Sequence, residues 1–398
     1  MIYGFYFRFY KLTHRKMISV ILSRVTYFVF LCKFLIKALL FTKKRIVKMS
    51  PENALNLINS IYPDPMYRPQ YRSVVMDSEI DLSVIIPVYN HADVLDKNIR
   101  AVINQKTGYN YEIVLVDDGS TDGAAEIVQQ FSSFPNVKVI TQKNAGIAAA
   151  RNTGLEHAAG RYLMFVDCDD TVHEDIVQVL LHHAYHNDCD IAMCAHNLAK
   201  EKNGLIYSII PNIYPDKNLL NYKNNDGIMN YAGLPWCKVY KRELWDKVRF
   251  FPGYWYEDNI IQFLLFTQCK KFVYIPKVEY EYIWHEKNFS HVQNNDKNIK
   301  SIDNYWILLA ILEKYKELGL PADGQLYTLL LKHISVYYYN MIKGLDKDIV
   351  DALFVLARRT LIEYKKSERV KLPFVLRFTE KALLEGNINL WKLSSSYQ

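Results

Sequence analysis

The chain has 398 residues, half of them hydrophobic, which is enough to bury one large core or two smaller ones. Its net charge of +7 is placed unevenly, because residues 1–48 hold eleven Lys or Arg and no Asp or Glu, and the other 350 residues therefore carry −4. Because this basic arm is also rich in aromatic side chains, it suits an anionic lipid surface better than nucleic acid. The six Cys residues form no CxxC pair and no disulfide framework, which indicates a reducing, cytoplasmic compartment.

The N-terminal arm, residues 1–48, combines basic charge with aromatic side chains, and this favours contact with an anionic lipid surface. Met17 to Phe41 is mostly apolar, but a spanning helix needs about 20 apolar residues and each central Lys or Arg costs roughly 2.5–3.5 kcal/mol. We therefore expect a peripheral helix at the inner face of the cell membrane. Two alternatives stay open, a single N-terminal span and an upstream start codon with the folded protein beginning near Met49. The aromatic residues are Phe5, Phe7, Phe9, Phe28, Phe30 and Phe34.

Residues 49–80 contain four Pro residues and are predicted to be a linker with one short helix. From Leu82 apolar runs alternate with helical periodicity, which predicts a parallel sheet with helical crossovers. A polar stretch from Asn197 to Asn230 is too irregular to assign, and residues 298–384 show helical spacing. Strands are expected at 82–88, 112–117, 137–141, 161–167 and 191–196, and helices at 93–105, 121–133, 146–158 and 173–186.

Three of the apolar runs end in polar loops, at Asn90, at Asp117 and Asp118, and at Asp167 to Asp170. Such loops meet at the carboxyl edge of a parallel sheet, where α/β proteins bind ligands. Residues at i and i+2 of an extended segment point the same way, so Asp167 and Asp169 can present two carboxylates to one point, and such oxygen ligands suit Mg²⁺ or Mn²⁺. The alternative is that Asp169 or Asp170 caps the helix beginning near His173.

Four segments in this order resemble the signatures of family 2 glycosyltransferases with the GT-A fold. The resemblance covers residues 80–290 and implies an α/β domain at 81–290, with a mixed, mainly parallel, Rossmann-like sheet flanked by helices. Its donor half is 81–196, its acceptor half is 197–290, and a helical C-terminal region follows at 291–398. The segments are SVIIPVYN at 83–90, VDDGSTD at 116–122, NAGIAAARNTG at 144–154 and FVDCDD at 165–170.

The resemblance implies a donor site for a nucleotide-sugar. Asp117 or Asp118 is expected to contact the nucleotide, since a carboxylate accepts from imide N–H and sugar hydroxyl groups, while the other shapes the turn. Gly146 lets the backbone approach a phosphate at a helix start. Arg151 either joins this site or pairs with a carboxylate at the sheet edge. The implied nucleotide-sugar contacts are Pro87, Tyr89, Asp117, Asp118, Asn144, Gly146, Arg151 and Asp167.

The second half supplies the catalytic and acceptor-side candidates. By resemblance Asp258, with Glu257 beside it, takes the proton of the acceptor hydroxyl. The alternative is helix capping, and a helix start is expected to lower the pKa of Asp258. Trp236 and Lys238 are expected on the acceptor side, although an aromatic residue in an apolar run is more often part of a core. His285 is a candidate third metal ligand beside Asp167 and Asp169.

The predicted activity is metal-dependent, inverting transfer of a sugar, from a UDP-sugar, to a hydroxyl of a glycan or lipid-linked oligosaccharide in bacterial capsule or other surface polysaccharide synthesis. The chain lacks the QxxRW element of processive synthases, which favours one transfer per encounter. Two alternatives remain, a polyprenyl-phosphate glycosyltransferase and a nucleotide-sugar binding protein without turnover.

Overall fold

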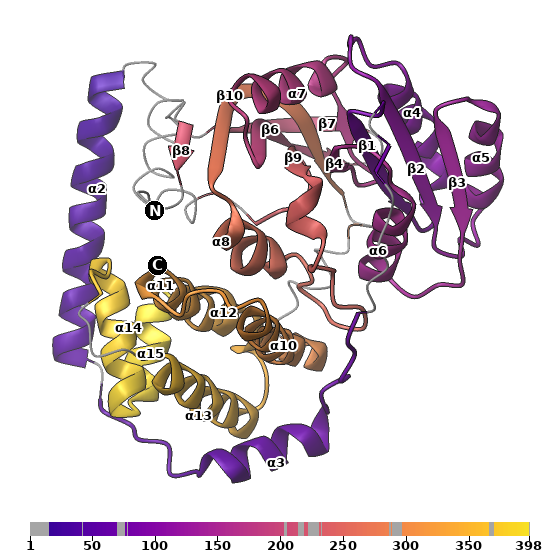
Figure 1. The fold of residues 1–398 in the computed structure, drawn as a ribbon. Coiled ribbons are helices and arrows are strands. Elements are labelled where there is room, and N and C mark those ends of the chain that lie inside the picture. The colour runs from indigo at the N-terminus through magenta and orange to yellow at the C-terminus, as the bar shows by residue number, and fades with distance from the viewer. Residues whose placement is uncertain are drawn as a thin grey trace. The chain divides into compact units, whose positions relative to one another are not determined.

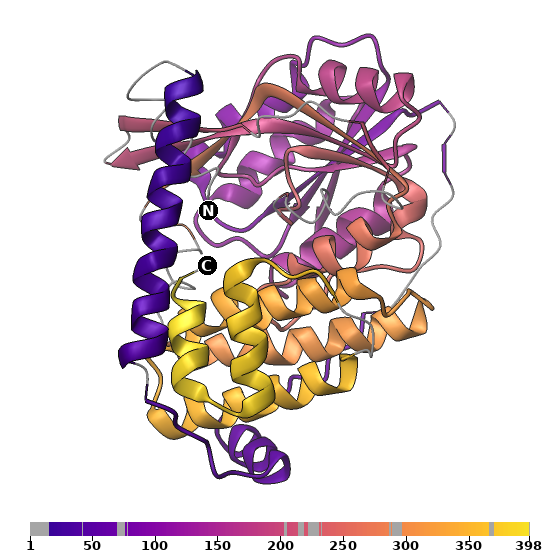
Figure 2. The same ribbon diagram turned by 90° about the vertical axis from the view of Figure 1, so that its left-hand side faces the viewer.

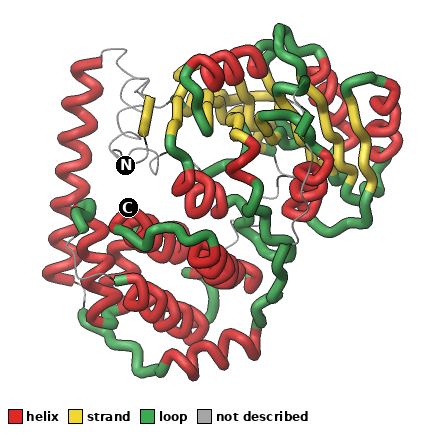
Figure 3. Tube along the Cα trace, viewed as in Figure 1, coloured by secondary structure: helices red, strands yellow, loops and turns green. Residues whose placement is uncertain are grey.

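The computed structural model describes residues 16–41, 43–69, 76–77, 79–202, 205–213, 219–221, 231, 233–285, 288, 297–365 and 370–397. The chain divides into two compact units. One contains residues 65–292 and 306–320 and is built around a sheet, and the other contains residues 1–64, 293–305 and 321–398 and is built of helices (Figure 3). The boundary at Asp64 and Pro65 falls inside the segment expected to be a linker.

The sheet of the larger unit has the strand order β3-β2-β1-β4-β9-β6-β10-β5, with β7 paired to β6 and β8 to β10 (Figure 1). Strands β3, β2, β1 and β4 are mutually parallel, as are β6 and β10, while β9 runs antiparallel between the two groups. The expected α/β, mixed GT-A-like architecture is confirmed. The strands are β1 (Leu82–Val88), β2 (Tyr111–Asp117), β3 (Val137–Thr141), β4 (Tyr162–Phe165), β5 (Thr171–Val172), β6 (Ile191–Lys202), β7 (Leu205–Asn212), β8 (Leu219–Asn221), β9 (Lys238–Lys241) and β10 (Lys271–Trp284).

Continuous apolar runs form the centre of this sheet. Every residue of β1 and of β4 is buried, as expected for parallel strands covered on both faces. The helix α6 packs on β1 and β2, and Gly154 makes that approach feasible, because a Cβ there would lie 2.2 Å from Cγ2 of Ile85. The helices of this unit are α4 (Ala92–Ile103), α5 (Ala124–Gln130), α6 (Ile147–His157), α7 (Ile176–His186), α8 (Phe266–Gln268) after a helical turn at Ile261–Leu265, and most of α10 (Asp303–Glu317).

The polar stretch that resisted assignment contains strands. β6 continues to Lys202 and forms an antiparallel pair with β7. The apolar side chains of β7 are exposed, Leu205 at 75% and Tyr207 at 61%. β7 has no buried face, so its sequence lacks the alternation of apolar and polar residues that predicts a strand.

The helical C-terminal region is confirmed, and helices from the N-terminal part of the chain join it in the smaller unit. Pro51 at the first position and the Ser50 hydroxyl, which accepts from the Asn53 N–H, start α3 (Pro51–Ile61). α3 packs on α13 (Lys347–Tyr364). The other helices are α2 (Lys16–Ile36), α11 (Gly324–Lys332), α12 (Tyr338–Ile342), α14 (Phe374–Glu385) and α15 (Ile388–Ser395).

The described part of the arm contains α2, which lies beside the C-terminal helices (Figures 1 and 2), whereas Phe5, Phe7 and Phe9 fall outside the described residues. Phe34 is fully buried, with its ring centroid 4.9 Å from that of Phe378 and 5.4 Å from that of Tyr397. Among the described helices none combines the length and the apolar character needed to cross a bilayer.

Candidate functional site

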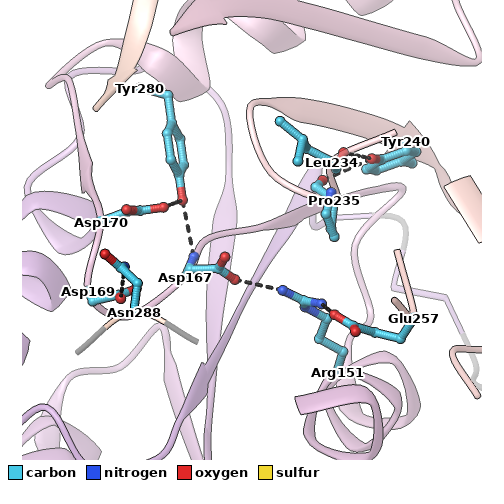
Figure 4. A network of polar contacts seen from close by, with 10 residues as sticks. All are labelled: Arg151, Asp167, Asp169, Asp170, Leu234, Pro235, Tyr240, Glu257, Tyr280 and Asn288. Atoms are coloured by element: carbon cyan, nitrogen blue, oxygen red, sulfur yellow. Dashed lines mark hydrogen bonds and ion pairs between the residues drawn. The ribbon is translucent and has the colours of Figure 1, made fainter. Parts of the chain in front are cut away.

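The chain after β4 is anchored by Asp170, the last of the three aspartates (Figure 4). Asp170 is 1% exposed and accepts hydrogen bonds from the Tyr280 hydroxyl at 2.7 Å and the Ile283 N–H at 2.9 Å, both on β10. Burial and the charges of Asp169 and Asp167 raise the pKa of Asp170 well above its usual range. Asp175, and not Asp169 or Asp170, occupies the cap position of α7. Asp170 thus ties β10 to the end of β4 and fixes where its two neighbours lie.

Arg151 connects the donor-side and acceptor-side motifs. This residue of α6 is 2% exposed and donates to Oδ1 of Asp167 at 2.8 Å and to Oε1 of Glu257 at 2.7 Å (Figure 4). Burial opposes its charge, but Asp167 and Glu257 outweigh that effect and raise the pKa of Arg151. Pairing with a sheet-edge carboxylate was the alternative left open for Arg151. The guanidinium group holds two carboxylates from different halves of the domain in fixed places.

Asp258 lies next to this ion-pair group and has a different environment. It is partly buried, and burial followed by the negative charge of Glu257 raises the pKa of Asp258 to about 7, although Arg151 opposes the shift. The expectation that a helix start lowers this pKa is wrong, because burial and the charge of Glu257 outweigh the lowering effects of Arg151 and of a backbone hydrogen bond. Tyr256, just before the pair, has a left-handed backbone with φ of 64°. Such a conformation is costly for a residue other than glycine and is found preferentially at functional sites.

The two aspartates after β2 have separate partners. Asp118 uses both oxygens to hold the next loop, accepting from Gln142 Nε2 at 2.6 Å, the Ala145 N–H at 2.9 Å and the Gly146 N–H at 2.8 Å. Asp117 accepts from the Ser120 N–H at 3.0 Å through Oδ1, and its Oδ2 has no hydrogen-bond partner among the described residues. Both aspartates are 2% exposed, and of the two only Asp117 keeps a carboxylate oxygen that is not used within the described residues.

The loop that Asp118 holds leads into α6. Asn144, Ala145 and Gly146 are exposed, and Gly146 adopts φ of 86°, which favours glycine. The first N–H groups of α6 follow directly. The predicted donor-side residues Asn144 and Gly146 thus lie in an open loop that begins a helix, the local geometry that suits a phosphate group.

The loop after β1 contains His91, which was not among the site residues predicted from the sequence. Pro87 is the last residue but one of β1 and is buried, while Tyr89 is 46% exposed. Asn90 and His91 follow with φ of 65° and 67°. The Asn90 side chain accepts from the Thr121 N–H at 2.9 Å, which joins this loop to the loop after β2.

His91 lies with Asp169 and His285 in one group, and their ligand atoms are all within 4.8 Å of one another. Nε2 of His285 is 3.3 Å from Oδ2 of Asp169, and the imidazole centroids of His91 and His285 are 5.8 Å apart. Asn288 braces the group, because it donates to Asp169 at 3.1 Å and accepts from the His285 N–H. Of the three expected metal ligands, the structure brings Asp169 and His285 together, while Asp167 is held by Arg151.

The two acceptor-side candidates lie inside the protein. Trp236 is 5% exposed, and its ring stacks at 4.7 Å on Tyr280 and at 5.5 Å on Tyr282. Lys238 is fully buried and donates to the Leu234 carbonyl at 2.8 Å. Burial lowers the pKa of Lys238. Both side chains pack inside the domain, and neither exposes much surface that an acceptor could contact.

The sequence matches the model of the glycosyl transferase family 2 over residues 83–249. It is 34% identical over 265 residues to glycosyltransferase GlyA of Streptococcus pneumoniae serotype 4, and the matched region covers 64% of this chain and 36% of GlyA. It is 30% identical over 254 residues to the uncharacterized glycosyltransferase YibD of Escherichia coli K12, which covers 60% of this chain and 72% of YibD. The chain thus spans 36% of the length of GlyA and most of the length of YibD.

The fold is similar to that of S. aureus TarS residues 1–349, with a TM-score of 0.57 at 17% identity, covering 80% of this chain and 90% of that one. A structure of the same protein in complex with UDP-GlcNAc gives a TM-score of 0.50 at 16% identity, covering 80% and 91%. With the four motifs meeting at one edge of this sheet, and with a relative matched over most of its length, the chain belongs to glycosyltransferase family 2 and is a glycosyltransferase.

Proposed function

We propose that this enzyme transfers one sugar per encounter from a UDP-sugar to a hydroxyl of a glycan or lipid-linked oligosaccharide, with inversion at the anomeric carbon. The observation that carries the proposal is Asp258, a partly buried carboxyl with a pKa of about 7. A base with a pKa near the working pH is deprotonated in a large fraction of molecules and still accepts a proton strongly. Inverting chemistry needs one such group.

The donor is assigned to the edge formed by the loops after β1, β2 and β3. Asp117 offers a carboxylate oxygen to the nucleotide, exposed Tyr89 offers a ring face, and the N–H groups that begin α6 suit a phosphate. The fold shared with a protein whose structure includes UDP-GlcNAc supports uridine as the nucleotide. Asp118 serves the donor indirectly by holding the Ala145 and Gly146 backbone.

In the proposed reaction Asp258 accepts the proton of the acceptor hydroxyl as its oxygen attacks the anomeric carbon. The bond from that carbon to the diphosphate breaks, and its electron pair leaves with the nucleoside diphosphate. Glu257 is paired with Arg151 and acts as a positioning residue. Asp167, held by the same guanidinium, is assigned to the donor sugar.

A divalent metal, Mn²⁺ or Mg²⁺, belongs to this proposal. Asp169 and His285 are the residues that would hold it, and a carboxylate oxygen with an imidazole nitrogen is a donor set that such ions accept. When bound, the ion would offset the charge on the departing diphosphate.

Membrane contact through α2 is proposed as the link to a lipid-linked acceptor. The face opposite Phe34 carries apolar side chains that are 49% to 74% exposed, and Arg24 and Lys33 flank this stripe at helical spacing. An exposed apolar stripe with basic flanks fits an anionic membrane surface, here the inner face of the bacterial cell membrane. The stripe consists of Ile21, Val25, Phe28, Val29, Ile36 and Leu39.

Vesicle sedimentation tests that contact. Binding to vesicles of phosphatidylcholine mixed with phosphatidylglycerol should exceed binding to phosphatidylcholine alone and should fall several-fold in Phe28→Ser. Tyr67→Ser removes an exposed aromatic residue that is not part of α2, 48% exposed against 66% for Phe28, and should bind as the parent does. Equal binding of Phe28→Ser and the parent would remove α2 from the proposed membrane surface.

Calorimetric titration of UDP, GDP and TDP, with Mn²⁺ and with EDTA, tests the donor assignment. UDP should bind best, and Asp117→Asn should weaken it while the protein keeps its melting temperature. UDP-sugar consumption with glycan acceptors is then compared in the parent and Asp258→Asn, which should bind UDP and lose transfer. Full activity of Asp258→Asn would instead favour a phosphate acceptor, which needs no base. UDP binding without consumption of any donor would favour a binding protein without turnover.

A further inference from the structure

His91 has an uncommon backbone conformation. Its φ of 67° and ψ of 29° are left-handed, a region that only a few per cent of residues other than Gly adopt, with His, Asn and Asp the more frequent among them. The residue stands at the cap position of α4, yet its side chain makes no capping hydrogen bond. The backbone is nevertheless fixed, since its carbonyl accepts from the Val94 and Leu95 N–H groups, both at 3.1 Å. What this conformation achieves is the placement of an imidazole beside Asp169 and His285.

The three side chains converge from separate parts of the domain. His91 precedes α4, Asp169 follows β4 and His285 follows β10, and their ligand atoms all lie within 4.8 Å of one another. Atoms that share one first-row metal ion lie roughly 3 to 4.4 Å apart, because each is about 2.0 to 2.2 Å from the ion. Small rotamer changes therefore suffice for all three to bind one ion. Asn288, which contacts both Asp169 and the His285 backbone, keeps two of the three in place.

We propose that His91 is a third protein ligand of the divalent metal, and that the two imidazoles make the site select a transition metal such as Mn²⁺ over Mg²⁺. This inference rests on the metal-dependent function proposed above and adds to it both a ligand and a metal preference. Mg²⁺ favours oxygen ligands and loses its water reluctantly. Mn²⁺ also accepts oxygen ligands, but as a first-row transition metal, although the weakest binder of that series, it accepts imidazole nitrogen more readily than Mg²⁺ does. A site with one carboxylate and two imidazoles therefore penalises Mg²⁺.

Binding of Mn²⁺ to the full-length protein, followed by the electron paramagnetic resonance signal of free Mn²⁺ and without any sugar donor, tests the inference. Mg²⁺ is then added as competitor to obtain the Mn²⁺ over Mg²⁺ preference. The variant is His91→Asn, because Asn tolerates the left-handed backbone and preserves the loop. His186→Asn is the control, since His186 is exposed at the end of α7. Unchanged melting temperatures show that the variants are folded.

We expect His91→Asn to weaken Mn²⁺ about tenfold or more and to reduce the Mn²⁺ over Mg²⁺ preference, with His186→Asn equal to the parent. Asp169→Asn should lose most Mn²⁺ binding. Unchanged Mn²⁺ affinity in His91→Asn, beside the loss in Asp169→Asn, would overturn the role of His91 and leave the proposed function intact.

Two further results would also count against His91 as a ligand. A loss of UDP affinity in His91→Asn that is equal in Mn²⁺ and in EDTA would place His91 on the nucleotide instead. No Mn²⁺ binding by the parent, measured with UDP present, would remove the metal altogether. Sugar transfer measured in EDTA then tells whether the transferase function survives that result.

Discussion

The burial of Asp258 favours its neutral form, whereas its proposed role as a base requires the negatively charged carboxylate. Its pKa of about 7 predicts that kcat/KM rises with pH through that value and levels off above it, because only the carboxylate accepts a proton. Glu257→Gln removes the stronger of the two negative neighbours that raise this pKa, Glu257 and Asp167, and Arg151 stays in place, so the inflection should move to lower pH. Initial rates of UDP-sugar consumption against pH measure both. A profile that is flat between about pH 6 and 8 would exclude Asp258 as the base.

The same carboxyl makes stability depend on pH. A group whose pKa is higher in the folded chain binds its proton more tightly there, so its contribution to stability is largest at low pH. That contribution is lost as the pH rises from the unfolded value, near 3.9, to about 7. Asp258→Asn carries no charge to bury, so at about pH 8 its free energy of unfolding should exceed that of the parent by on the order of 1 kcal/mol or more, and it should melt at a higher temperature. At about pH 4 the two proteins should melt together. A destabilised variant at both pH values would contradict this account.

Single residues were predictable where a motif defines their chemistry and less so where burial decides it. The aspartates after β2 and β4, Arg151 and Asp258 could be named from the sequence. The sequence did not reveal that both carboxylate oxygens of Asp118 already accept hydrogen bonds, three in all, or that the Lys238 side chain is buried. His91 lies one residue beyond the first motif, and its only signal was an imidazole directly after a strand-ending loop.

The packing of α6 on β1 depends on one glycine. In Gly154→Ala the new Cβ would lie 2.2 Å from Cγ2 of Ile85, so helix or strand must shift. We expect a loss of about 1–3 kcal/mol in the free energy of unfolding. UDP affinity should fall too, because α6 carries Arg151 and begins at the donor loop. Urea denaturation and calorimetry measure the two effects.

A double-mutant cycle isolates that contact. Ile85→Ala removes Cγ2 and should cost stability alone, but Gly154→Ala should cost less in its presence, giving a favourable coupling between the two positions. Additive effects would mean that the glycine matters for backbone reasons and not for close approach.

Most strands and helices of the donor half lie within about three residues of the predicted bounds, because continuous apolar runs and helical periodicity alternate there, but β5 was not predicted and β6 extends six residues further than expected. β1 and β3 begin and end where expected, and β2 begins one residue earlier. The pattern failed for β7, whose apolar residues are exposed, and for the arm, whose helix α2 packs one face on its own chain. Which face of a helix is covered depends on distant residues such as Phe378, and local periodicity contains no information about them.

The described part of the N-terminal arm packs within the smaller unit. Phe34 is buried against Phe378 and Tyr397, and Arg45 forms an ion pair with Asp351 of α13, which is nearly buried. A chain that starts at Met49 loses both sets of contacts. It exposes aromatic surface on α14 and leaves a carboxylate without its partner, and losing one member of such a pair is costly.

The chain starting at Met49 should therefore melt several degrees lower than the full chain and bind more of a dye specific for exposed apolar surface.

Two substitutions compare the buried face of α2 with its exposed face. In the full chain, Phe34→Ala should lower the free energy of unfolding by about 3–5 kcal/mol, as expected for a buried aromatic residue, whereas Phe28→Ala on the exposed face of α2 should change it by about 0.5 kcal/mol or less. Equal melting of the Met49 chain and the full chain would contradict this packing, whereas a difference between Phe34→Ala and Phe28→Ala would place the arm within the folded core. Because only one face of α2 contributes to that core, its other face can carry membrane contact without loss of stability.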